Sequence, residues 1–173
     1  MNITLHRTLM VCMLAGVLAL TIALVAAKDV SAAPSPELAG GATQISGVGS
    51  FDESCDPKSV DASYAILMTG DLQGCLYTFI ETAQSSPSGT YRETGTELFV
   101  GSTSEGAGTF ATTYRFEAKY EDVNDPATEI FGRCQHPIVE GSGTGVFEGV
   151  SGQLFFKDEV VSGTYLYRGH LRY

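Results

Sequence analysis

Residues 108–120 alternate between two kinds of side chain, and this alternation constrains the fold more than any other feature of the chain. Successive side chains of a β-strand point to opposite faces, so one face of such a strand would be mainly aromatic and the other polar or charged. The first face holds Phe110, Thr112, Tyr114, Phe116, Ala118 and Tyr120. In a water-soluble protein we expect that face to pack into a core.

Seven further runs rich in Val, Ile, Thr, Tyr and Phe are separated by clusters of Gly, Pro, Asp and Ser, without convincing helical spacing. The expected strands are residues 43–51, 62–69, 75–82, 90–100, 108–120, 128–139, 146–156 and 161–172. Short connections favour antiparallel pairing of successive strands. We therefore predict an all-β fold, a single eight-stranded antiparallel up-and-down barrel, with a two-sheet sandwich as the alternative.

The N-terminal segment is typical of an export signal, because an apolar run from Leu9 to Ala27 follows a short basic start. Cleavage is expected after Ala27, or as late as residue 32 or 33. The apolar run is long for a signal, so a retained membrane anchor is the alternative. Residues 28–42 are expected to form a flexible leader to one domain, residues 43–173. A secreted or cell-envelope location follows.

The formal net charge of −10 makes nucleic acid and anionic membranes poor partners for this chain. Outside the signal segment, Cys55, Cys75 and Cys134 suggest one disulfide and one free thiol. If residues 62–69 form an extended strand, Cys55 and Cys75 lie near its opposite ends, more than about 20 Å apart and too far to bridge. The sequence leaves the pairing open.

The pattern Gly-x-Gly-x-Phe occurs three times, at residues 47–51, 106–110 and 143–147. The third copy lies in the glycine-rich run 141–152, which lacks the glycine spacing of a dinucleotide fingerprint and the Gly-Lys-Ser/Thr of a phosphate loop. Glycine at these positions permits a bulge or a sharp bend, and the Phe that follows can enter the barrel mouth as a plug. The run therefore indicates architecture.

Residues 138–152 (IVEGSGTGVFEGVSG), together with the following Leu-Phe-Phe and the terminal Tyr-Leu-Tyr-Arg-Gly, resemble the strand-turn-strand of the allene oxide cyclase and dirigent barrels. The likeness covers roughly the last third of the chain. It implies a calycin-like closed barrel with an apolar cavity, as an exported member of a family that guides cyclisation or radical coupling without a cofactor. The matched residues are architectural, so the resemblance assigns no catalytic residue.

Cys134 and His136 lie two residues apart in a strand-like run and share one face. If Ile130 and Ile138 mark that face as inward, both side chains line the cavity, where His136 is a candidate catalytic acid or base. The alternative is a hydrogen-bonded core histidine. The spacing of His, Cys, Asp and Glu matches no metal site, so we expect no metal.

Glu93 and Glu97 lie on one face of one strand, about 13 Å apart, which is too far for a glycosidase pair. The alternation of the neighbouring residues is too weak to decide whether the two carboxyls face the interior or solvent, and we slightly favour solvent. If the face is inward, Glu97 is the second candidate catalytic residue, because a carboxyl in an aromatic cavity can stabilise a cationic or proton-transfer transition state.

Two functions remain open. In the first, the exported barrel binds a small apolar molecule and acts as a cofactor-free isomerase or cyclase, or in a dirigent manner; in the second, it is a rigid, non-catalytic module with a packed interior. A cavity of about 300 Å³ or more would favour the first. A homo-oligomer is compatible with both. The expected ligand-binding residues are Tyr91, Phe110, Tyr114, Phe116, Cys134, Tyr165 and Tyr167.

Overall fold

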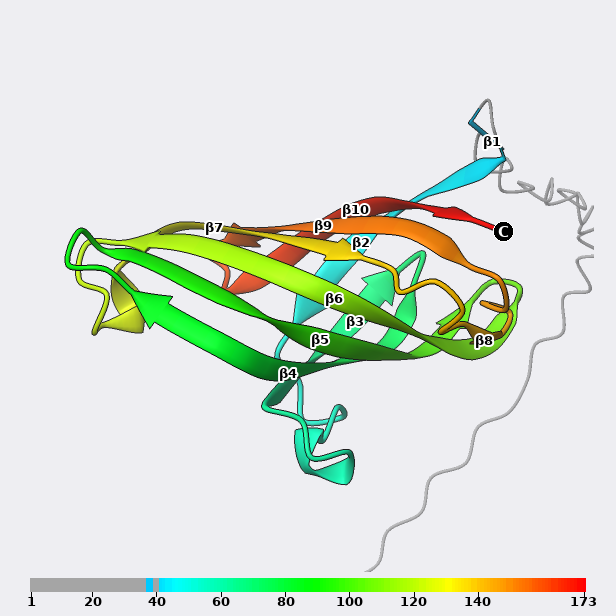
Figure 1. Cartoon of the computed structure of the whole chain (residues 1–173), viewed down its shortest axis with the longest axis horizontal. Helices are drawn as coiled ribbons and strands as arrows, with labels where there is room; N and C mark the ends of the chain where they lie inside the picture. Colours follow the sequence, from blue (N-terminus) through cyan, green and yellow to red (C-terminus); the bar gives the residue numbers. More distant parts are fainter. Residues whose placement is uncertain (1–36, 39–40) are drawn as a thin grey trace, which may run out of the picture. The chain divides into compact units, whose positions relative to one another are not determined.

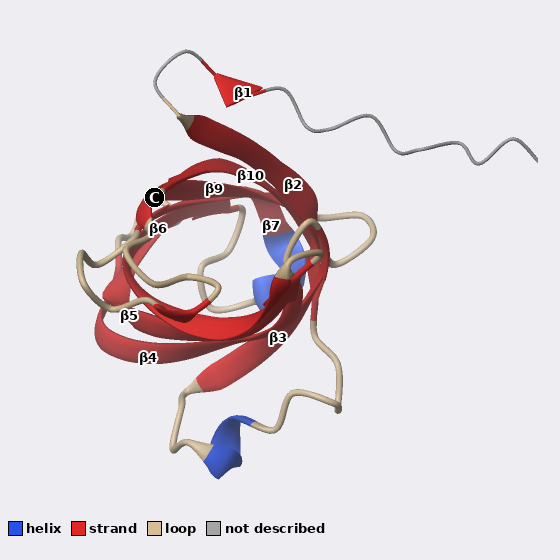
Figure 2. Ribbon diagram, turned by 90° about the vertical axis from the view of Figure 1, so that its right-hand side faces the viewer, coloured by secondary structure: helices blue, strands red, loops and turns tan. Residues whose placement is uncertain are grey.

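The computed structural model describes residues 37–38 and 41–173, and the predicted export signal, its cleavage sites and most of the leader lie outside them. Eight strands form a closed barrel (Figures 1 and 2). They are β2 (Ala42–Ser50), β3 (Tyr64–Gly70), β4 (Gln73–Ser85), β5 (Thr90–Thr103), β6 (Gly106–Tyr120), β7 (Glu129–Pro137), β9 (Ser151–Glu159) and β10 (Thr164–Arg172).

Four short elements lie outside the ring of eight strands. The strand β1 (Glu37–Leu38) pairs with β2, so the predicted leader already contains strand residues, and β8 (Thr144–Gly145) pairs with β6. Two 3₁₀ turns, η1 (Pro57–Ser59) and η2 (Pro126–Thr128), lie in connections. None of the helices among the described residues is long and apolar enough to span a membrane.

Each strand of the ring pairs with the strand that follows it in the chain, and every pairing is antiparallel. The last strand, β10, pairs with the first, β2, which closes the ring. Most connections in the ring are short, which favours antiparallel pairing with the next strand, and closure removes exposed sheet edges. The predicted up-and-down barrel is confirmed, and the sandwich is not formed.

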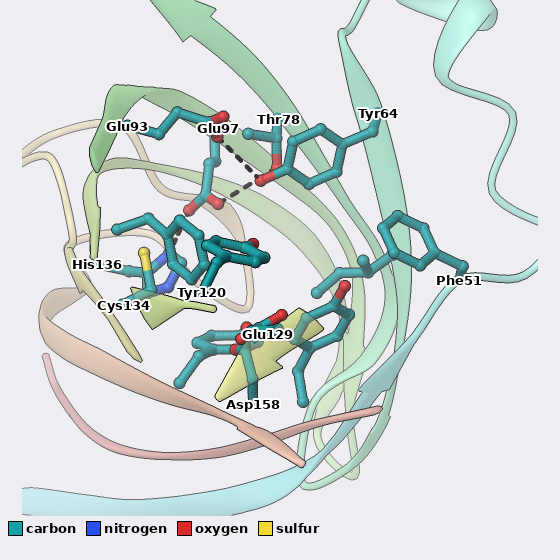
Figure 3. A pocket seen from close by; sticks show the side chains of 14 residues that line it. Phe51, Tyr64, Thr78, Glu93, Glu97, Tyr120, Glu129, Cys134, His136 and Asp158 are labelled. Atoms are coloured by element: carbon teal, nitrogen blue, oxygen red, sulfur yellow. Dashed lines mark hydrogen bonds and ion pairs between the residues drawn. The ribbon is translucent and has the colours of Figure 1, made fainter. Parts of the chain in front are cut away.

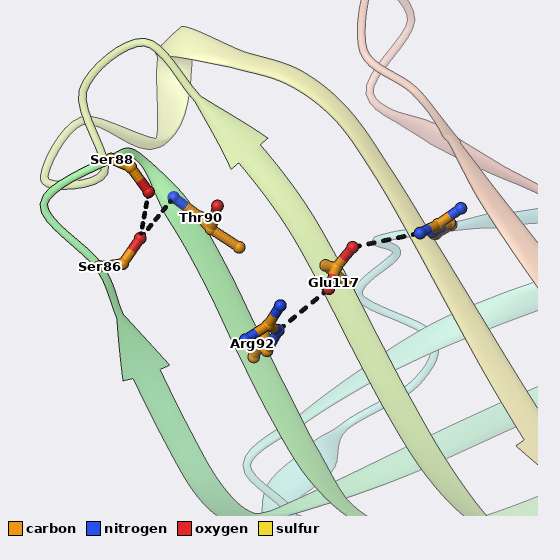
Figure 4. A network of polar contacts seen from close by, with 6 residues as sticks. Ser86, Ser88, Thr90, Arg92 and Glu117 are labelled. Atoms are coloured by element: carbon orange, nitrogen blue, oxygen red, sulfur yellow. Dashed lines mark hydrogen bonds and ion pairs between the residues drawn. The ribbon is translucent and has the colours of Figure 1, made fainter.

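The alternation of β6 divides inside from outside as predicted, since Phe110, Tyr114 and Ala118 are buried. On the outer face, Glu117 accepts from Arg92 at 3.0 Å and from Arg133 at 3.2 Å (Figure 4). In the last expected strand the same alternation predicts an inward face made of Tyr165, Tyr167, Leu171 and Tyr173. The first three residues face inward in β10. The prediction is wrong for Tyr173, which follows the end of the strand and is 63% exposed.

One end of the barrel is closed by a phenylalanine plug, which consists of Phe99, Phe110 and Phe147. All three rings are fully buried, and their centroids lie 4.9–5.7 Å apart. Phe110 and Phe147 each follow a Gly-x-Gly pair, so the prediction that this Phe enters the barrel is confirmed for both. It is wrong for Phe51, which is 61% exposed.

The glycine-rich run folds as turns over this end, and the expectation of a strand from residue 146 is wrong because β9 begins at Ser151. Gly145 and Gly149 have φ angles of +60° and +77°, a left-handed conformation that a side chain disfavours. The bends that they permit turn Phe147 back into the barrel. The glycines therefore position the plug.

Cys55 and Cys75 form a disulfide with their Cα atoms 5.6 Å apart, so the argument that they cannot bridge is wrong. The error lay in placing Cys55 at the start of the following strand. Ser50, the last residue of β2, pairs with Leu67 in the middle of β3, and Leu67 pairs with Cys75. The chain therefore passes Cys75 before it turns back through η1 to begin β3. Cys134 is the buried free cysteine.

Candidate functional site

A cavity of about 180 Å³ lies toward the barrel end opposite the phenylalanine plug and is lined by residues of seven strands (Figure 3). It reaches the surface beside Phe51. Its volume is below the 300 Å³ at which we expected a drug-sized ligand site, although a cavity of about 150 Å³ can hold a benzene-sized molecule. The barrel is therefore neither packed solid nor roomy.

Glu97 and His136 meet in this cavity, and both are almost fully buried, with exposed fractions of 3% and 4%. The interpretation that Glu93 and Glu97 face solvent is wrong. The Nδ1 atom of His136 lies 2.6 Å from Oε2 of Glu97. Thr112 donates to the same oxygen at 2.5 Å, and Thr78 donates to Oε1 at 3.3 Å. The carboxylate thus has three donors, which compensate the loss of water around a buried charge.

The other ring nitrogen of His136, Nε2, is buried and has no hydrogen-bond partner. The imidazole stacks on Tyr114, with ring centroids 6.2 Å apart, and packs against Phe156 at 4.4 Å. Because the carboxylate of Glu97 accepts from Nδ1–H, the neutral ring carries its lone pair on Nε2. His136 lines the cavity, and its Nε2 has unused hydrogen-bonding capacity.

Glu93 lies four residues before Glu97 on the same face of β5, and its carboxylate accepts hydrogen bonds from three tyrosines. The hydroxyl of Tyr114 donates at 2.7 Å and that of Tyr64 at 3.4 Å, and Tyr91 donates to the second oxygen. Burial, and next the Glu93 carboxylate, raise the pKa of Tyr91 and Tyr114 well above its usual range. All three tyrosines are therefore neutral donors at physiological pH.

Glu129 and Asp158 form a pair of neighbouring carboxyl groups, which we call the mouth carboxyl pair. The pair occupies space that is left free because Gly132 has no side chain. A Cβ on Gly132 would lie 2.3 Å from Oδ2 of Asp158 and 2.7 Å from Oε1 of Glu129. Burial, and then the neighbouring Glu129 carboxyl, raise the pKa of Asp158 to about 7. Two carboxyl groups this close share a proton, because both cannot ionise without repulsion.

The strand register explains why Glu129 faces inward. The pairing of β6 with β7 shifts between Lys119 and Tyr120, so that Ile130 is skipped and Glu129 pairs with Tyr120. A β-bulge of this kind re-aims the residues beside it. Ile130 is consequently 52% exposed, and its expected role as an inward marker is wrong. Cys134 and His136 nevertheless both line the cavity, as expected.

The expected ligand-binding residues separate into four groups. Phe116, Cys134 and Tyr165 line the cavity. Tyr91 and Tyr114 stand behind it as donors to Glu93, whereas Phe110 belongs to the plug. The hydroxyl of Tyr167 donates to the Thr69 carbonyl at 3.1 Å and accepts from the Leu72 amide at 2.9 Å, which is a structural role. The buried Cys134 is a thiol, because burial raises its pKa.

Sequence reasoning missed several lining residues: Phe51, Tyr64, Ile66, Thr78, Tyr120, Glu129, Phe156 and Asp158. Asp158 could have been found, since it has the same parity in its strand as the buried Leu154 and Phe156. Glu129 could not, because only the bulge brings it inward. Across residues 37–38 and 41–173, no group of three or more His, Cys, Asp or Glu side chains is placed to hold a metal ion.

No protein-family model matches the chain, and no curated protein or solved structure matches it significantly. The resemblance to the allene oxide cyclase and dirigent barrels therefore stays a prediction from local sequence.

Proposed function

We propose that this protein binds a small, mainly apolar molecule in the barrel cavity and isomerises or cyclises it by proton transfer at His136, without a cofactor. The observation that carries the proposal is the buried Glu97–His136 pair, in which Nδ1 is bonded to the carboxylate while Nε2 has no partner. A buried nitrogen without a partner costs free energy, and a ligand group that bonds to it would recover that cost.

The pair has the composition of an oriented general base. Glu97 fixes the ring and its tautomer, so Nε2 can accept a proton from the ligand, and the imidazolium that forms is stabilised by the adjacent carboxylate. The same nitrogen can return the proton to another atom of the ligand, which moves a double bond or closes a ring. Thr78 and Thr112 hold the carboxylate in place, and the reaction consumes no oxidant or reductant.

A ligand oxygen that gains negative charge during proton transfer needs a hydrogen-bond donor. Tyr64 lines the cavity, and at 3.4 Å its bond to Glu93 is the longest of the three tyrosine bonds. Of the three tyrosine hydroxyls, that of Tyr64 can therefore turn toward a ligand with the smallest loss of hydrogen-bond energy. Because its pKa is raised by burial, and next by Glu93, Tyr64 donates rather than ionises.

A binding module without catalysis is the second candidate, and the cavity volume favours it. At about 180 Å³ the cavity holds only a small ligand or part of a larger one. In that case Nε2 of His136 serves recognition alone.

The two candidates are separated by native mass spectrometry of protein from its own host, followed by incubation of any released ligand with fresh protein in D₂O. We expect a co-purifying molecule that the wild type converts with uptake of deuterium. His136→Gln should bind it with the same stoichiometry but convert it at least about 100-fold more slowly. Binding without conversion by the wild type would leave the binding module; equal conversion by His136→Gln would refute the role of His136.

If no molecule co-purifies, and no apolar compound raises the melting temperature, the ligand cavity itself is refuted.

A further inference from the structure

We propose that the ligand of this cavity carries an organic ammonium group, and that the mouth carboxyl pair and the aromatic rings around it hold that group. This assignment rests on the proposed ligand cavity and names the chemical class of its occupant. It differs from the apolar ligand expected from sequence in adding one positive charge at a defined place.

The charge of the cavity wall supports a cation. Four lining side chains are carboxylic acids, Glu93, Glu97, Glu129 and Asp158, and within residues 41–173 no Lys or Arg lines the cavity. Such a wall repels anions and attracts cations, most strongly where water is excluded. His136 is the single basic side chain of the lining.

The four carboxyls are not equivalent. Glu93 and Glu97 each have three donors from the protein, so their hydrogen-bonding capacity is largely used. Oε1 of Glu129 is buried without a partner, and neither Glu129 nor Asp158 forms an ion pair with a described residue. Among the four carboxyl groups of the lining, those of the mouth carboxyl pair therefore have the most unused hydrogen-bonding capacity.

Aromatic rings surround this pair. Phe51 and Tyr165 pack edge to face with centroids 5.7 Å apart, and both line the cavity with Tyr120. Tyr120 and Tyr165 line the same cavity as Glu129 and Asp158, and these carboxyls contribute, after burial, to the raised pKa of both tyrosines. Ring faces together with carboxylates bind alkylammonium groups through cation–π attraction, whereas an inorganic cation prefers oxygen ligands alone.

The second polar feature of the same cavity fixes the orientation of the ligand. His136 lines the cavity, is more than nine-tenths buried, and has an Nε2 atom without a hydrogen-bond partner. A ligand with its ammonium group at the mouth thus presents its other end to His136. A charged nitrogen joined to a ring or a short chain fits a cavity of about 180 Å³.

The test compares two probes of almost equal shape, benzylamine and benzyl alcohol, by calorimetry at pH 8 with the full folded domain. The cationic probe should bind at least about tenfold more tightly than the neutral one, because only it pairs with the carboxylates. In the variant Asp158→Asn with Glu129→Gln the ratio should fall to about one. Glu117→Gln removes a carboxylate from the outer surface and should leave the ratio unchanged.

The double variant could fail to fold, so a second variant and a measurement at a second pH test the same proposal independently. Gly132→Ala places a methyl group where the pair lies, at a backbone conformation that alanine accepts, and should lower the ratio in a folded protein. In the wild type the ratio should also fall at pH 5.5, where a proton on Asp158 removes one of the two negative charges of the pair. The groups that face Asp158 in this titration are Glu129, Tyr120 and Tyr165.

Equal affinity for the two probes would overturn the ammonium assignment and leave a neutral-ligand cavity intact. Failure of both probes to bind would overturn the assignment as well, and co-purification of a neutral molecule would then decide the proposed function separately. A ratio that survives both carboxyl substitutions would equally refute it.

Discussion

The two ends of the barrel are built from the same strands but hold opposite kinds of side chain. Strand β5 contributes Phe99 to the plug and Glu93 to the cavity, and β9 contributes Leu154 to the core and Asp158 to the mouth. The plug consists of three fully buried rings, whereas the cavity end contains four carboxyl groups and a histidine, which the plug lacks. The difference teaches that the inward face of a single strand can contribute apolar side chains to the core and, a few residues further on, polar side chains to the candidate site.

The physical reason lies in how each end is covered. At the plug, the turns of residues 141–150 return a phenylalanine into the barrel. Within residues 41–173 no such segment fills the other end, and most buried polar groups there have partners on neighbouring strands, with Nε2 of His136 and Oε1 of Glu129 as exceptions. We therefore expect the plug to supply most of the stability and the cavity end to supply the chemistry.

The largest effect is expected from Phe147→Ala, which opens a hole in the plug. Removal of a fully buried ring costs about 3–5 kcal/mol in free energy of unfolding, measurable by denaturant titration. The matched control is Phe51→Ala at the cavity end, where the ring is 61% exposed and the expected cost is at most about 1 kcal/mol. Similar costs for both variants would contradict the assignment of stability to the plug.

The next effect is expected from Glu97→Ala, which leaves His136, Thr78 and Thr112 buried without their acceptor. The free energy of unfolding should fall by about 3 kcal/mol, because unpartnered buried donors are costly. Glu97→Gln retains one acceptor oxygen and should cost clearly less in the same titration. If the alanine variant were as stable as the wild type, the buried network would contribute nothing.

A smaller effect is expected from the pH dependence of Asp158. Its folded pKa of about 7 lies above the unfolded value, so the folded protein retains a proton that the unfolded chain has lost. The wild type should therefore lose stability as the pH rises from about 4 to about 7, by roughly 2 kcal/mol with allowance for solvent screening. Asp158→Asn should abolish this slope in unfolding curves measured across that range; an unchanged slope would refute the shifted pKa.

The smallest effect is expected from Glu117→Gln on the outer face. Arg92, and next Arg133, lower the pKa of Glu117, so its contribution is present above the unfolded pKa and lost as the pH falls through the folded value. This sign is opposite to that of Asp158. The ion pairs are exposed, so the melting temperature should change little, and the difference should vanish in 1 M salt. A large, salt-independent loss would show that the outer charges matter as much as the inner ones.

The sequence predicted the fold because strand parity and turn composition act locally. The inward face of β6, the order of the strands and the inward position of Cys134 and His136 all follow from period-two alternation. The pairing of Glu97 with His136 was not predictable, since the two residues are 39 positions apart and meet only through the registers of β5, β6 and β7.

Two of the remaining errors arose where the chain leaves regular strand geometry and alternation fails. The bulge at Ile130 turned Glu129 inward, and the return of the chain after Ser50 brought Cys55 to Cys75. Glu93 and Glu97 lie on a regular strand, but neighbouring Thr and Gly residues gave no contrast between faces. Only tertiary pairing decided their side.

The number of paired residues differs between neighbouring strands around the barrel. The ladder between β2 and β3 runs only from Gly47 to Ser50, against Leu67 to Gly70, whereas β5 and β6 pair along almost their whole length. Local opening begins where few hydrogen bonds must break, so the amide hydrogens of this short ladder should exchange with solvent before those of β5. The disulfide ties the segment after β2 to β4 across β3. The covalent bridge therefore links the segment that follows β2 to β4 and should hold the two sides of the short β2–β3 ladder together when its hydrogen bonds open.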